Sequence, residues 1–125
     1  MLKIVLWIGA GGFLGSISRY LLSQWIARCW LHEWPAATFA VNMLGCLLIG
    51  CLIGLFERFG MGGPEYRLFL TAGFCGSFTT FSTFTAESLS LLRSGQWFLF
   101  FGYIMLSLIA GIFFTWAGMR LAGVK

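Results

Sequence analysis

Four stretches of this chain contain no charged residue, which constrains its fold more than any other feature. They cover residues 4–18, 34–56, 68–86 and 94–119, with lengths of 15, 23, 19 and 26 residues. A transmembrane helix needs about 20 mostly apolar residues. The first stretch is short, but the sequence continues apolar beyond Arg19, whose guanidinium can extend to the membrane surface. We therefore expect four spans, at about residues 4–25, 36–56, 67–92 and 96–119.

The composition excludes a water-soluble domain. Apolar residues make up 59% of the 125 residues and charged residues 10%, whereas soluble domains carry about 25% charged residues. Four spans use about 80 residues, which leaves no room for a separate soluble domain. The sequence predicts an all-α integral membrane protein in which residues 1–125 form one four-span domain.

The charges are placed as in membrane proteins. Eight basic and four acidic residues give a net charge of +4, but they are scattered singly. Nucleic-acid binding needs a basic patch, so the sequence does not indicate it. With four spans both termini lie on one side, and that side holds five basic residues against two or three on the other. This modest excess favours termini in the cytoplasm.

The cysteines and the histidine indicate no metal or disulfide site. The four cysteines form no C-x-x-C pair, and three lie in apolar stretches, where Cys behaves as a small apolar residue. The only histidine, His32, stands beside Glu33 in a polar connection, and we interpret it as solvated at the membrane surface. The first apolar stretch outlasts a signal-peptide core and lacks a clear A-x-A site, so we expect a retained span.

The third span is unusual because it is rich in hydroxyl groups. Seven serines and threonines fall within residues 77–88, and phenylalanines alternate with them. One or two hydroxyls can bond back to a carbonyl of the preceding turn, but seven are more than such local bonds account for. With Gly73 and Gly76 nearby, the sequence favours an interrupted helix, because weak helix formers and hydroxyls can accommodate freed backbone groups. Carbonyls at such a break can coordinate a small cation.

The string G-F-C-G-S-F-T-T-F-S-T-F at residues 73–84, with Asn42 and a G-x-x-x-R pattern ending in Arg19, resembles the CrcB/Fluc family of fluoride channels. The resemblance covers essentially the whole chain, and T-T-F-S-T-F is its most specific part. It implies that two four-helix subunits assemble antiparallel in the bilayer as a dual-topology homodimer with two pores.

The resemblance also implies roles for single residues. Backbone carbonyls of Gly76 and Thr79 from both subunits would hold a central, structural sodium ion. Arg19 would lie near the pore vestibule, and Glu87 ends the motif without a transport role. The implied pore residues are Asn42, Phe81, Phe84, Tyr103, Ser107 and Thr115, with Ser82 and Thr83 as weaker candidates. The chain departs from the family at Ser77, where many members have Gly, and at Gly111, where many have Ser.

These residue types suit the chemistry of fluoride. A small hydrated anion enters a low-dielectric path only where other donors replace its water. The Asn42 amide, the hydroxyls and the polarised ring edges of Phe81 and Phe84 are donors of modest strength. A fixed Lys or Arg in the path would bind the ion too tightly for conduction.

Three other classes of membrane protein compete with a fluoride channel. A small multidrug-type transporter also has four short spans, but it needs an acidic residue in the first span, and residues 4–18 contain none. A structural membrane assembly protein would account for the many glycines, which allow close helix contact, but not for the hydroxyl-rich span. An enzyme would need a base or metal at membrane depth. We expect a passive channel of the bacterial inner membrane that exports cytoplasmic fluoride and has no ATP-binding motif.

Overall fold

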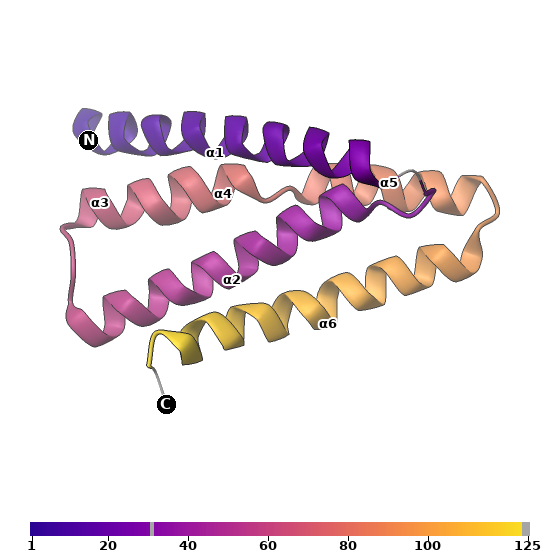
Figure 1. Ribbon diagram of the computed structural model, residues 1–125. Coiled ribbons are helices and arrows are strands. Elements are labelled where there is room, and N and C mark those ends of the chain that lie inside the picture. The colour runs from indigo at the N-terminus through magenta and orange to yellow at the C-terminus, as the bar shows by residue number, and fades with distance from the viewer. Residues whose placement is uncertain (31, 124–125) are drawn as a thin grey trace.

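The computed structural model describes residues 1–30 and 32–123, and within these residues it is helical with no strand (Figure 1). The helices are α1 (Leu2–Cys29), α2 (Ala36–Phe59), α3 (Pro64–Leu68), η1 (Phe69–Cys75), α4 (Gly76–Phe78), α5 (Phe81–Arg93) and α6 (Trp97–Leu121). Helices α1, α2 and α6 are each long and apolar enough to cross a membrane. The prediction of an all-α membrane protein is confirmed at this level.

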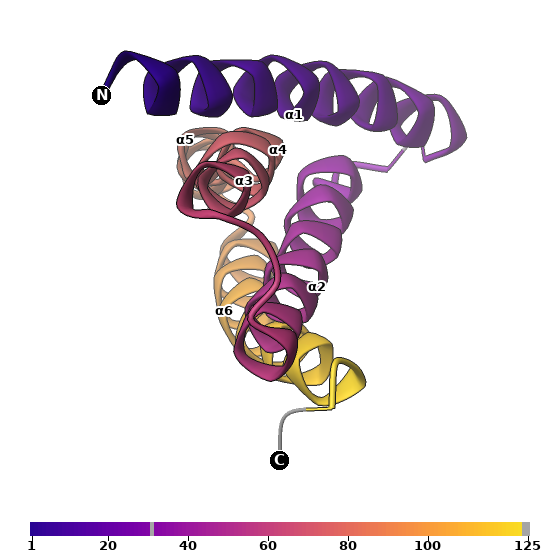
Figure 2. The ribbon, with the colours of Figure 1, turned by 90° about the vertical axis from the view of Figure 1, so that its left-hand side faces the viewer.

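Residues 64–93 form a row of short helices that we call the broken segment. It consists of α3, the π-helical η1, α4 and α5, which follow one another along α1 (Figure 1). Helix α1 packs mainly on η1 and α4, whereas α2 packs on α6. In a view along the broken segment, α1 crosses it at an angle on one side, and α2 and α6 lie on the opposite side of the broken segment (Figure 2). The N-terminus, the end of α6 and the connection from α2 to α3 lie at one end of the molecule (Figure 1).

Glycines allow the helices to approach closely, as the sequence indicates. A methyl group on Gly11 or Gly15 of α1 would collide with backbone carbonyls of η1. On the other side of the molecule, a methyl group on Gly50 of α2 or Gly118 of α6 would collide with the backbone of the opposite helix. These four glycines therefore serve packing within the chain.

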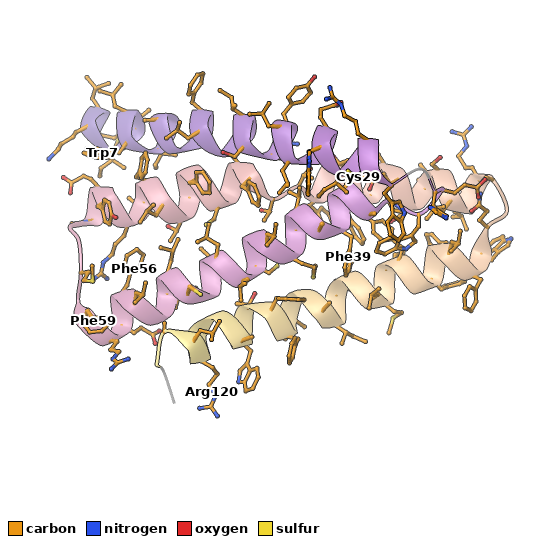
Figure 3. All side chains as sticks on the ribbon, viewed as in Figure 1. Trp7, Cys29, Phe39, Phe56, Phe59 and Arg120 are labelled. Carbon is orange, nitrogen blue, oxygen red and sulfur yellow. The ribbon has the colours of Figure 1, made fainter. Side chains whose placement is uncertain are left out.

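The outer faces of the helices are apolar. Many large apolar side chains are exposed, including Phe13 on α1 and Phe98 and Ile112 on α6. Figure 3 shows side chains projecting outward from both helices, with Arg120 at the end of α6 pointing away from the bundle. A large apolar exterior on a helical chain suits contact with lipid, and in water it would be a liability.

Helices α1, α2 and α6 correspond to three of the four predicted spans, whereas the region of the third predicted span is divided among α3, η1, α4 and α5. Helix α1 continues through Arg28 to Cys29, and α2 continues to Phe59, where Gly60 ends it in a left-handed conformation with φ of 59°. The seven-residue π-helix η1 was not predicted from the sequence. Its wide turns bring Gly73 against the backbone of α1, at Ile8 and Gly11. π-Helical turns are rare in proteins, and those that occur often lie at functional sites.

Candidate functional site

The broken segment is interrupted where the sequence predicts it. Helix α4 ends at Phe78, and α5 begins at Phe81 (Figure 1). Between them the backbone is extended, with φ −81° and ψ 159° at Thr79 and φ −146° and ψ 115° at Thr80. The Thr80 hydroxyl accepts a hydrogen bond from the Thr83 N–H at 3.3 Å and so caps the start of α5.

Asn42 of α2 holds the interruption with two hydrogen bonds to one residue. The Thr80 N–H donates to Asn42 Oδ1 at 2.8 Å, and Asn42 Nδ2 donates to the Thr80 carbonyl at 3.1 Å. The amide thus replaces helical partners that Thr80 lacks. From the sequence Asn42 is expected to be a pore donor, and this structural contact was not predicted. The sequence feature that points to this contact is a single Asn in an apolar span, opposite a predicted break, because a buried amide needs hydrogen-bond partners.

Arg19 of α1 binds the end of α4. Its Nε donates to the Ser77 carbonyl at 3.1 Å, and the side chain is half-buried. A cation near a helix C-terminus satisfies freed carbonyls and interacts favourably with the helix dipole. This contact with Ser77 was not predicted from the sequence.

The carbonyls of Gly76 and Thr79 have lost their ordinary helical partners. In an α-helix the Gly76 carbonyl would accept from the Thr80 N–H, but that group donates to Asn42. The Thr79 carbonyl would accept from the Thr83 N–H, which donates to the Thr80 hydroxyl. Two backbone oxygens at the interruption are therefore available for another ligand. Among the described residues there is no cluster of three or more acidic, His or Cys side chains that could hold a metal ion.

An open groove of about 770 Å³ runs past the interruption, between α2, the broken segment and α6. It brings together most of the residues singled out from the sequence. Those that line it are Asn42, Gly76, Thr79, Phe81, Phe84, Ser107 and Thr115. The remaining candidates, Arg19, Ser82, Thr83 and Tyr103, lie outside its lining.

The two phenylalanines occupy different environments. The Phe81 side chain is 74% exposed, whereas Phe84 is 8% exposed. Their ring centroids are 5.9 Å apart and the rings are tilted by 42°. Phe84 also packs on Tyr103, at 5.0 Å between centroids. One ring therefore faces out of the single chain and the other belongs to its core.

Tyr103 links this core to an acidic residue. The Tyr103 ring is fully buried, and its hydroxyl donates to Glu87 Oε2 at 2.9 Å. The Thr38 hydroxyl donates to Glu87 Oε1 at 2.7 Å, so hydroxyls from α2 and α6 hold both carboxylate oxygens. Thr38 is not among the residues predicted from the sequence. The sequence feature that points to Thr38 is its spacing of four residues from Asn42, which places both side chains on one face of α2.

The other hydroxyls divide into satisfied and unsatisfied groups. The Thr115 hydroxyl donates back to the Gly111 carbonyl at 3.0 Å, and the Thr80 hydroxyl donates to Thr83 Oγ1 at 3.0 Å. The Ser82 hydroxyl lies 3.4 Å from Thr80 Oγ1 on the exposed side of α5. Ser107 Oγ is covered from solvent and has no hydrogen-bond partner among the described residues. Ser107 is therefore the hydroxyl of the groove most in need of a ligand.

The two departures from the family pattern fit the structure without strain. The Ser77 carbonyl, which any residue supplies, is the group that binds Arg19. At Gly111 a side-chain Cβ would lie 3.6 Å from Cys46 Sγ and 3.8 Å from Met43 Cε. These are ordinary contact distances, so the groove at Gly111 has space that glycine leaves open.

Known proteins resemble this chain over nearly its whole length. The family described as "CrcB-like protein, Camphor Resistance (CrcB)" matches residues 6–119. Proteins named "Fluoride-specific ion channel FluC" are 44% identical in Leptospira interrogans over 94% of this chain and 92% of that protein. Those from Pseudomonas putida and Flavobacterium psychrophilum are 40% and 41% identical, over 97% of this chain and 98% of each protein. The chain belongs to the CrcB-like family.

Proposed function

We propose that this chain forms a fluoride-selective channel that lets cytoplasmic fluoride leave a bacterial cell passively. The observation that carries the proposal is the groove, which joins Asn42, Phe84 and Ser107 beside a helix break in a chain whose relatives are named fluoride channels. A channel of this family is not an enzyme. The multidrug-type alternative is not favoured, because relatives covering nearly the whole chain bear the fluoride-channel name.

The path depends on donors of graded strength. The Ser107 hydroxyl lacks a partner among the described residues, and the rings of Phe81 and Phe84 present positively polarised edges. Such groups replace part of the water around fluoride and still release the ion. Hydrogen fluoride enters from acidic surroundings and dissociates inside, and the negative interior then drives the anion out through a selective leak.

A second copy of the chain completes the channel, with four spans in each copy and the broken segment as the third. Phe81 is 74% exposed at the edge of the groove, and Gly76 is exposed beside it, so this face lacks cover in a single chain. An antiparallel copy related by a two-fold axis in the membrane plane would cover both residues. We place this dual-topology homodimer in the inner membrane.

A central sodium ion fits the same face. The Gly76 and Thr79 carbonyls have lost their helical partners, and two copies would offer four such oxygens to one cation. Oxygen ligands suit a hard cation such as sodium, and the interruption holds these two without any acidic side chain. The bound ion would supply positive potential near the path while lying outside it.

Growth on fluoride tests the proposal in cells. A bacterium that lacks its own fluoride exporter should regain growth on fluoride when it expresses this chain. Phe81→Ile should not restore growth, because isoleucine fills space without a polarised ring edge. Phe98→Ile is the matched control, since Phe98 is 91% exposed on α6 and lies outside the groove lining. Failure of the unmodified chain to restore growth, at normal membrane expression, would count against fluoride export.

A further inference from the structure

Thr79 is held from two directions at the interruption. Its N–H and its hydroxyl both donate to the Cys75 carbonyl, each at 3.0 Å. The next residue, Thr80, is fixed on α2 by the two hydrogen bonds with Asn42. The hydroxyl bond selects one rotamer of Thr79 and thereby the side on which its methyl group lies. The methyl group cannot turn away without breaking this bond, so a displaced methyl group would carry the Thr79 backbone with it.

Gly45 of α2 provides the space for this methyl group. A Cβ added to Gly45 would collide with Thr79 Cγ2 and would lie 3.3 Å from Phe78 Cδ1. Gly45 is buried, and both Gly45 and Thr79 line the groove. The absence of a side chain at this one position therefore lets the interruption lie directly against α2.

Gly45 differs from the four glycines that bring the helices together. A Cβ on any of those four would meet the backbone of an opposite element, so a side chain there would push whole elements apart. The atom nearest to a Gly45 Cβ is instead the methyl group of Thr79, whose carbonyl has lost its helical partner. Gly45 also follows Asn42 by three residues, which places both on one face of α2. That face thus contacts two consecutive residues of the interruption, Thr79 and Thr80.

We propose that Gly45 is a positioning residue for the central cation. It admits the Thr79 methyl group against α2, and the Thr79 carbonyl thereby remains available to sodium. A methyl group at residue 45 would displace Thr79 from α2 and so weaken the binding of the ion. This inference rests on the proposed sodium site, and Gly45 acts on the ion through Thr79.

Sodium-dependent thermal stability of the purified protein in detergent tests this inference. A cation that binds the folded protein raises the unfolding temperature as its concentration increases. Sodium chloride is exchanged for choline chloride at constant ionic strength. In Gly45→Ala the sodium concentration needed for a given rise in unfolding temperature should increase about ten-fold, because overpacking moves a ligand of the ion.

Thr79→Ser separates an effect on Thr79 from a general loss of packing. Serine keeps the carbonyl and the hydroxyl bond to Cys75, but it lacks the methyl group that a side chain at residue 45 would meet. In the double variant Gly45→Ala with Thr79→Ser, the sodium requirement should return to within about two-fold of that of the unmodified protein. Fluoride efflux from liposomes should fall in Gly45→Ala and recover in the double variant.

Gly50→Ala is the matched control, because Gly50 is also buried in α2 but its Cβ would meet the Thr115 backbone. This variant should lose stability, and adding Thr79→Ser should not restore it. If Gly45→Ala alone does not fold, a double variant that folds and binds sodium normally supports the proposal.

Two results would overturn the role of Gly45. One is an unchanged sodium requirement in Gly45→Ala, and the other is a double variant that shows no recovery. An unmodified protein that sodium does not stabilise would overturn the proposed sodium site and this inference with it. Fluoride efflux through the unmodified protein tests the channel function separately.

Discussion

At the scale of single residues, Asn42 shows how one side chain can hold a functional geometry. Its amide occupies both backbone groups of Thr80, at 2.8 and 3.1 Å. Each of these backbone groups would otherwise be a polar group at membrane depth without a helical partner. The residue that the family resemblance places in the pore is thus also the residue that keeps the interruption open on the α2 side.

Asn42→Ala should therefore lower both stability and flux. It removes two hydrogen bonds at once, and each unsatisfied backbone group costs about 1–3 kcal/mol. Thermal unfolding in detergent and fluoride efflux should both decline, while the dimer still forms. Asn42→Asp, which keeps an acceptor for the Thr80 N–H, should lose less stability than Asn42→Ala. Unchanged unfolding of Asn42→Ala would show that the contact with Thr80 carries little weight.

The two phenylalanines of the groove should differ when each is replaced by isoleucine. Phe81→Ile and Phe84→Ile should each cut fluoride efflux strongly, because both remove a polarised ring edge. Only Phe84→Ile should also lower the unfolding temperature, since Phe84 is 8% exposed and packs on Tyr103. Normal efflux in both variants would remove the rings from the mechanism.

At the scale of elements, the sequence predicts the helices and the interruption well. Uncharged stretches and a run of hydroxyls are local patterns, and residues 79 and 80 are extended as the weak helix formers indicate. The contact of Arg19 with Ser77 and the two hydroxyls on Glu87 could not be predicted this way. They join residues that lie 16 to 58 positions apart, and only the packing of the helices decides such pairs.

The interruption makes a testable distinction between side chain and backbone. Thr79→Ala should keep sodium, because the carbonyl remains and the lost hydroxyl only bonds back to Cys75. At Gly76 a Cβ would lie 3.6 Å from the nearest atom, the Thr71 carbonyl, so one chain tolerates alanine there. Gly76→Val should nevertheless weaken the proposed dimer and both its pores, since the valine side chain would face the second copy. Sodium-dependent thermal stability and dimer mass measure these effects; a stable Gly76→Val dimer with full flux would contradict them.

At the scale of the whole molecule, the distribution of exposed side chains supports the proposed assembly. Helices α1 and α6 expose apolar side chains that suit lipid, whereas the groove exposes Phe81 beside freed carbonyls. Lipid cannot satisfy those carbonyls, and a second copy can share a cation with them. A single chain is therefore half of the proposed channel.

Dual topology predicts that copies insert in both directions. A reporter fused after the C-terminus should be found on both sides of the inner membrane. The excess of basic residues on the side of the termini is modest, five against two or three, so it does not enforce one direction. Finding every reporter in the cytoplasm would exclude the antiparallel dimer.

Ion efflux from liposomes that contain only the purified protein tests the central claim most directly. Liposomes loaded with potassium fluoride, and matched ones loaded with potassium chloride, are given a potassium ionophore, and an electrode records the anion outside. Because the groove offers neutral donors of modest strength to a small anion, fluoride should leave rapidly and chloride should stay. Equal efflux of the two anions, or no fluoride efflux above that of protein-free liposomes, would contradict a fluoride-selective channel.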